Sequence, residues 1–165
     1  MTIQIREATP EEHDETGRVT ADAYREFVNK TEGDWQRYLD HIADVSGRAD
    51  RTVILVAVED GKVLGSSTLE LDGRVEPEDD GPLGPHEAHI RMLGVAPDAR
   101  GRGIAKLLMA ECEARARAAG RSLMTLNTTQ LMQAAQKMYE SLGYERGADR
   151  TFPDGFVLLS YSKAL

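Results

Sequence analysis

The sequence predicts an α/β (α+β) domain built around a mixed sheet, and two observations indicate this class. Short β-branched or alternating apolar segments are interspersed with longer segments whose apolar residues recur at helical spacing. In chain order the expected elements are one strand, two helices, three strands, a helix, a strand, a helix and two strands, which gives about seven strands and about four helices. With 165 residues and 41% apolar content, we expect a single domain over residues 1–165.

The N-terminal part predicts a short strand followed by two helices. Ile3 and Ile5 alternate with polar residues, as in a half-exposed strand. In the "TPEE" segment at residues 9–12, a threonine can cap a helix, a proline fits its first turn, and a glutamate can reach back to the cap. This helix is expected to continue to about residue 28, and a second helix to cover about residues 34–45.

The middle of the chain predicts a hairpin, a long loop and a third strand. A β-branched run at 53–58 and a return strand at 63–71 flank Asp60-Gly61, a two-residue turn signal. Residues 72–87 are rich in glycine, proline and acidic residues, and are expected to form a loop. The strand "EAHIRMLGV" follows and places Glu87, His89 and Arg91 on one face. Gly94 interrupts this strand, which predicts a bulge or a close backbone approach there.

The last third predicts two helices and three strands. Glycines end both helices, and the single cysteine, Cys112, lies on the apolar stripe of the first, where we expect it to be buried. The expected elements are a helix at about 101–119, a strand at 122–128, a helix at about 131–142, and strands at 144–150 and 156–162.

Charge and composition exclude several classes of protein. A formal charge of −8 argues against nucleic-acid binding and leans slightly toward a cationic substrate. One cysteine excludes an intramolecular disulfide, and the histidines lack metal-ligand spacing, so no metal is expected. The N-terminal residues show no secretory signal, and the most apolar run is too short to span a bilayer. We therefore expect a cytoplasmic protein that does not interact with membranes.

The segment "RGRGIA" at residues 100–105 joins a strand to a helix. A helix N-terminus offers about four free amides and a positive dipole end, so glycines and arginines there could bind a phosphate group. The alternative is a helix start whose glycines only turn the chain. A dinucleotide fingerprint is excluded because its third glycine would fall at Lys106, and a nucleoside-triphosphate loop is excluded because no Gly-Lys-Ser/Thr follows.

Two longer segments resemble one known family. "MLGVAPDARGRGIAKLL" is similar to the coenzyme A signature of the GCN5-related N-acetyltransferases, Gln/Arg-x-x-Gly-x-Gly/Ala, filled here by Arg100, Gly103 and Ala105. "TTQLMQAAQKMYESLGYER" resembles a later helix of that family, with Tyr139 and the pair Gly143-Tyr144. The resemblance implies a mostly antiparallel sheet that splays after its fourth strand.

The same resemblance implies how the chain would bind acetyl-CoA as a cosubstrate, without a metal. The amides of residues 100–105 would hold the diphosphate. The splayed strand at 93–95 would pair with the pantetheine arm, and one of its amides would face the thioester oxygen. Asn127 could contact the pantetheine. The cofactor-binding residues implied are Leu93, Gly94, Val95, Arg100, Gly101, Arg102, Gly103, Ile104, Ala105 and Asn127.

Three residues are candidates for proton transfer. Tyr139 matches the tyrosine of the family that protonates the departing thiolate, although it could simply pack on its helix. His89 occupies the position at which some members carry a glutamate general base, and Glu87 lies two residues earlier on the same strand face. The sequence leaves open whether His89, Glu87 or a water molecule is the base.

The predicted function is therefore direct transfer of an acetyl group to a primary amine of a small molecule or peptide. A non-catalytic acyl-CoA-binding or sensing domain of the same fold is the alternative. The sequence leaves open the identity of the amine, the size of the acyl group and the formation of a homodimer.

Overall fold

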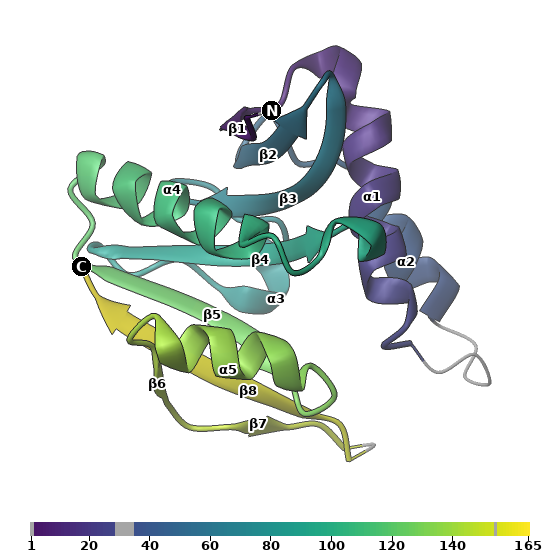
Figure 1. Ribbon diagram of the computed structural model, residues 1–165. Helices are drawn as coiled ribbons and strands as arrows, with labels where there is room; N and C mark the ends of the chain where they lie inside the picture. The colour runs from purple at the N-terminus through teal and green to yellow at the C-terminus, as the bar shows by residue number, and fades with distance from the viewer. Residues whose placement is uncertain (1, 29–34, 154) are drawn as a thin grey trace.

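One mixed sheet of eight strands organises the chain, and the computed structural model describes residues 2–28, 35–153 and 155–165 (Figure 1). The strand order is β1-β2-β3-β4-β5-β8-β6, and β7 also pairs directly with β8, nearer to the N-terminal end of β8 than β6 does. All pairings are antiparallel except that of β4 with β5. The strands are β1 (Gln4–Glu7), β2 (Val53–Glu59), β3 (Lys62–Glu70), β4 (Glu87–Val95), β5 (Leu123–Thr129), β6 (Glu145–Arg146), β7 (Arg150–Thr151) and β8 (Val157–Ala164).

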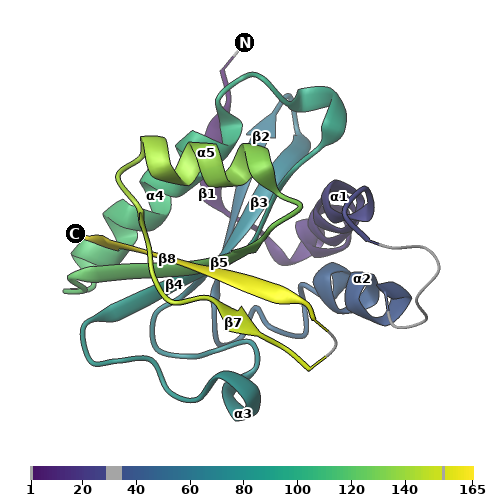
Figure 2. The same cartoon turned by 90° about the horizontal axis from the view of Figure 1, so that it is seen from below.

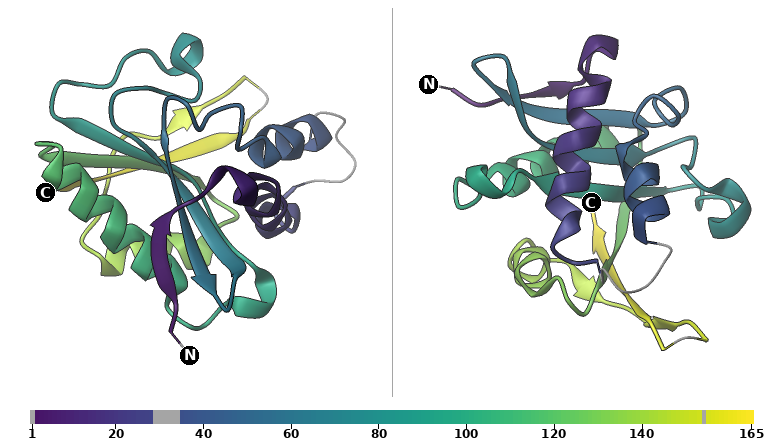
Figure 3. Two further views of the ribbon diagram at one scale, coloured as in Figure 1. Left: turned by 90° about the horizontal axis from the view of Figure 1, so that it is seen from above. Right: turned by 90° about the vertical axis from the view of Figure 1, so that its right-hand side faces the viewer.

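Helices cover both faces of this sheet, so the fold has three layers (Figure 2). On one face, α4 packs its apolar side, which includes Leu108, Met109 and Cys112, into the main core, and α5 lies beside β5. On the other face, α1 packs against β3 and β4, and α2 lies beside α1 (Figure 3). The helices are α1 (His13–Arg25), α2 (Trp35–Ala43), α3 (Pro77–Asp80), α4 (Ile104–Ala118) and α5 (Gln133–Ser141).

The predicted start of the first helix is confirmed in outline. The Thr9 amide donates to Glu12 Oε1 at 2.9 Å, and residues 10–12 form a 3-10 turn before α1 begins. The helix ends at Arg25 rather than near residue 28. The second helix is described from Trp35, so its expected first residue at 34 lies outside the described residues.

The predicted hairpin is also confirmed, because Asp60 and Gly61 both have positive φ, at 53° and 76°. The loop expected at 72–87 contains one short helix, α3, which begins at Pro77. Two acidic residues of this segment bind the guanidinium of Arg91 on β4, Asp80 at 2.5 Å and Glu76 at 3.3 Å. The loop is therefore tied to the sheet.

The close backbone approach predicted at Gly94 is confirmed, because a Cβ there would lie 3.5 Å from the Thr20 carbonyl oxygen of α1. Strand β4 also carries a bulge, but it lies before Gly94 rather than at it. Ser66 pairs with Gly94 and Thr68 pairs with Arg91, so Ser67 alone opposes two residues. Met92, one of the two, has φ of +53°. The extra residue turns Met92 to the face of α1 and α2, where it packs in a small second core.

The predicted splay after the fourth strand is confirmed. Strands β4 and β5 pair in parallel only over Glu87–Ile90 and Leu123–Leu126. Beyond these pairs both strands continue, β4 to Val95 and β5 to Thr129, and the ribbons separate (Figure 1). The edges of two adjacent strands thus face each other without pairing.

The C-terminal region differs in detail from the prediction. The strand expected at 144–150 is divided into β6 and β7, which both pair with β8. Arg146 closes the turn between them by binding both carboxylate oxygens of Asp149. In the described residues, this division gives eight strands rather than about seven, and the short α3 gives five α-helices rather than about four.

Candidate active site

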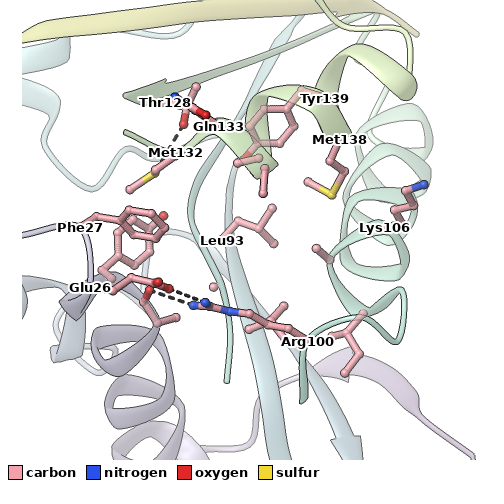
Figure 4. Close-up of a pocket in the computed structure, with 18 of the residues that line it drawn as sticks. Glu26, Phe27, Leu93, Arg100, Lys106, Thr128, Met132, Gln133, Met138 and Tyr139 are labelled. Carbon is pink, nitrogen blue, oxygen red and sulfur yellow. Dashed lines mark hydrogen bonds and ion pairs between the residues drawn. The ribbon is translucent and has the colours of Figure 1, made fainter. Parts of the chain in front are cut away.

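A cavity of about 620 Å³ lies where β4 and β5 diverge. Its wall is built from the last turn of α1, the end of β4, the segment leading into α4, the end of β5 and the first turns of α5 (Figure 4). Parallel strands in register leave no such space, so the splay creates the cavity. Segments that are distant in the sequence, such as α1 and α5, both contribute residues to this lining.

A glycine-rich segment forms one end of the cavity. Gly101 and Gly103 have φ of 81° and 78°, a conformation that L side chains rarely adopt, and open space lies beside both. Gly103 caps α4, and the first helical hydrogen bond runs from the Leu107 amide to the Gly103 carbonyl at 3.1 Å. The preceding amides therefore lack helical partners. Both the helix dipole and the absence of Cβ atoms suit a bound phosphate group.

The unpaired edge of β4 forms one side of the cavity. Leu93, Gly94 and Val95 line it, and their other edge is occupied by β3, since Gly65 pairs with Val95 and Ser66 with Gly94. Their backbone groups that point toward β5 are consequently available to an extended ligand. These are the three strand residues that the sequence predicts as cofactor-binding.

Tyr139 of α5 lines the cavity on the side opposite to Arg100, which opens the glycine segment (Figure 4). Its side chain is 6% exposed, and its ring packs against those of Tyr161 and Tyr144 at centroid distances of 5.8 and 6.1 Å. Burial raises the pKa of its phenol well above the ordinary value, so the hydroxyl stays protonated at neutral pH. Tyr139 thus packs on its neighbours while its phenol keeps a proton, so the packing observed here does not exclude the donor role.

Comparison with known proteins assigns the family. Residues 18–144 match the model of the Acetyltransferase (GNAT) family. The chain belongs to this family. An acetyltransferase of Pectobacterium atrosepticum is 33% identical over 117 residues, which cover 71% of this chain and 69% of that protein. This GNAT protein thus has named acetyltransferase relatives, which support an acyltransferase activity.

Solved structures agree with the GNAT fold. YncA of Salmonella typhimurium, solved with acetyl-CoA, has a TM-score of 0.72 at 21% identity and covers 100% of this chain and 95% of its own. PaiA N-acetyltransferase of Thermoplasma acidophilum, solved with coenzyme A, has a TM-score of 0.73 at 14% identity and covers 97% of this chain and 98% of its own. At these identities the likeness concerns the fold.

The two arginines of the glycine segment of this GNAT chain point in different directions. Arg100 lines the cavity, where it forms an ion pair with the carboxylate of Glu26 and donates to the Ala23 carbonyl at 3.3 Å. The guanidinium of Arg102 binds both carboxylate oxygens of Glu59, at 3.1 and 2.5 Å. It does not line the cavity. Of these two arginines, only Arg100 is therefore placed to bind a ligand there through its side chain.

Asn127 lines the cavity from β5, as the sequence predicts. Its Oδ1 accepts a hydrogen bond from Ser160 Oγ of β8 at 3.2 Å. That bond leaves the amide NH₂ group of Asn127 as a donor for a ligand.

The structure does not bring His89 and Glu87 to the cavity. Thr125 of β5 stands between them, with its Oγ1 2.7 Å from His89 Nδ1 and 2.5 Å from Glu87 Oε2. Burial, together with the nearby Arg74 and Arg91, lowers the pKa of His89 to about 3, so the imidazole is neutral at physiological pH. The two residues that the sequence offers as bases therefore both bind the hydroxyl of Thr125 instead of facing the cavity.

Glu26 and Lys106 line the cavity but were not predicted from the sequence. Glu26 lies far from the glycine segment in the chain, and no local pattern links it to Arg100. Among the described residues, no cluster of three or more histidine, cysteine or acidic side chains could hold a metal ion. In that part of the chain, no helix is long and apolar enough to cross a membrane.

Proposed function

We propose that this protein transfers an acetyl group from acetyl-CoA directly to a primary amine of a small molecule or peptide. One observation carries the proposal. A single cavity between splayed strands has a glycine cradle with free amides at one end and a protonated tyrosine at the other. Membership of the GNAT family supports the same cosubstrate.

Direct transfer, within a complex of both substrates, is favoured over a covalent enzyme intermediate. Cys112, the single cysteine, is fully buried on α4 and does not line the cavity. Burial raises the pKa of its thiol to about 12, so the nucleophilic thiolate is scarce at neutral pH. The amine nitrogen of the acceptor is therefore the attacking atom.

Each part of the cavity has one task in the reaction. The amides of residues 100–105 bind the diphosphate, and those at Leu93–Val95 hold the pantetheine arm. One of the strand amides stabilises the negative charge that develops on the thioester oxygen. The amine nitrogen forms a bond to the acetyl carbon as the carbon–sulfur bond breaks, and Tyr139 gives its proton to the departing sulfur. The proton that the nitrogen loses as the amide forms then restores the phenol of Tyr139.

The amine must lose a proton before it attacks, and water is our choice of proton acceptor. His89 and Glu87 lie outside the cavity lining, so neither contacts an amine bound there. A water molecule in the cavity can carry the proton to solvent. The position of His89 and Glu87 outside the cavity lining also favours the second candidate function, an acyl-CoA-binding or sensing domain that lacks turnover.

Calorimetric titration of acetyl-CoA tests the proposal first. We expect micromolar binding by the natural chain and loss of binding in Gly103→Glu, whose carboxylate would repel the diphosphate. Gly120→Glu is the matched control, because Gly120 has the same φ of 78° at the other end of α4 and equally open surroundings. It should bind normally.

A screen of primary amines by thiol release then separates the two candidates. Release of coenzyme A in the presence of one amine class supports the transferase. Tight binding without release for any amine would favour the sensing domain. Failure of a folded natural chain to bind acetyl-CoA would overturn both.

A further inference from the structure

The ion pair between Glu26 and Arg100 lies at the cavity (Figure 4). Glu26 is the residue that follows α1, and Arg100 opens the glycine segment before α4. Both side chains are partly exposed, at 48% and 41%, and both line the cavity. The arginine nearest to the phosphate cradle is thus held by a carboxylate from another element.

The position of Glu26 is electrostatically unfavourable without its partner. It caps the C-terminal end of α1, where free carbonyls carry a partial negative charge that repels a carboxylate. It is also the single carboxylate among the cavity-lining residues that the structure describes, in a cavity that suits an anionic ligand. Arg100 offsets both effects.

This pair can exchange partners readily. Exposed arginine–carboxylate pairs are weak, and partly exposed side chains change rotamer quickly. A diphosphate carries more negative charge than one carboxylate and can accept two parallel hydrogen bonds from a guanidinium. A diphosphate bound on the amides of the cradle would therefore draw Arg100 away from Glu26.

We propose that Glu26 is a built-in competitor for Arg100 that weakens binding of the acyl-CoA diphosphate. The inference rests on the proposed function, because it takes acyl-CoA as the ligand of the cradle. Binding breaks the Glu26–Arg100 pair, and release of the product re-forms it. Glu26 therefore sets the affinity of the cosubstrate and favours departure of coenzyme A after transfer.

Calorimetric titration of coenzyme A into Glu26→Gln tests this directly. We expect its Kd to fall by about three- to tenfold relative to the natural chain, since Arg100 then keeps only its hydrogen bond to the Ala23 carbonyl and no longer an ion pair. Glu59→Gln is the matched control, because Glu59 forms a comparable pair with Arg102 from the same segment but outside the cavity. Its Kd should stay within twofold. A thermal melt of each variant checks folding.

The same substitution in an Arg100→Gln background separates exchange from simple repulsion. Arg100→Gln alone should weaken binding about tenfold, and adding Glu26→Gln should then change nothing. An equal gain in both backgrounds would mean that Glu26 repels the phosphates directly and would overturn the exchange. An unchanged Kd in Glu26→Gln, or an equal gain in Glu59→Gln, would overturn it as well. If the natural chain does not bind, the proposed function itself fails.

Discussion

His89 Nδ1 lies 2.7 Å from Thr125 Oγ1, at the last pair but one that joins β4 to β5. The same hydroxyl donates to Glu87 Oε2 at 2.5 Å, so it accepts the hydrogen of the imidazole. Three side chains thereby fasten the two strands just before they separate. These hydrogen bonds hold β4 and β5 together next to the point at which the strands separate and the cavity opens.

This arrangement predicts that His89 makes folding stability depend on pH. Its folded pKa of about 3 lies below the unfolded value of about 6.5, so between these values the unfolded chain binds the extra proton. Stability is therefore lost as pH falls through this window. The loss attributable to His89 is about 2 kcal/mol between pH 7.5 and pH 5.

Urea denaturation of the natural chain and His89→Gln at both pH values measures this loss. The difference between the two chains should shrink by about 2 kcal/mol at the lower pH, whereas contributions from the carboxylates cancel. Equal pH profiles would show that His89 is not held neutral. If His89→Gln also abolished turnover at unchanged stability, the water-mediated deprotonation that we propose would be wrong.

Much of the fold follows from local patterns in the sequence. The Asp60-Gly61 turn and the glycine segment before α4 depend on backbone conformations with positive φ, and the residue types at these positions indicate such conformations. Glycine is a common bulge residue, so the local pattern favours a bulge at Gly94. Its real position at Met92 results from the register between β3 and β4, which no local pattern encodes.

The site was predictable where the backbone forms it and less so where side chains do. The residues that offer amides, at the end of β4 and before α4, line the cavity as expected. Arg102 does not, because Glu59 on β2 binds it, and His89 does not, because Thr125 lies opposite in the sheet. Such partners are distant in the sequence and become neighbours only through the topology.

Gly94 is predicted to be required for packing of α1 on the sheet. A Cβ at this position would lie 3.0 Å from the Ala23 Cβ and 3.5 Å from the Thr20 carbonyl oxygen. Gly94→Ala should therefore push α1 outward and cost about 1–3 kcal/mol of unfolding free energy. Gly84→Ala is the control, because its Cβ would make only ordinary contacts, with Glu87 at 3.5 Å and beyond. Chemical denaturation that gave both variants the same stability would contradict this account.

Cys112 should be unreactive in the folded protein. Its side chain is fully buried, its Sγ lies 3.3 Å from Ser67 Oγ, and burial raises its pKa to about 12. A chromogenic disulfide reagent should therefore give no signal with native protein at pH 8 and one thiol per chain in denaturant. Rapid native labelling would show that α4 opens locally, and would reopen the question of a covalent intermediate.

Tyr139→Phe should separate catalysis from binding. Tyr139 lines the cavity, and the substitution keeps the ring that packs against Tyr144 and Tyr161 and removes only the hydroxyl. If Tyr139 protonates the departing sulfur, kcat for the amine found in the screen should fall about a hundredfold or more, while the Kd for acetyl-CoA stays within twofold. Tyr144→Phe is the control, because its hydroxyl binds Glu113 at 2.9 Å and does not line the cavity. That variant should lose about 1–2 kcal/mol of stability and keep its kcat. Equal turnover by Tyr139→Phe and the natural chain would instead leave Tyr139 as a packing residue, with water as the proton donor to sulfur.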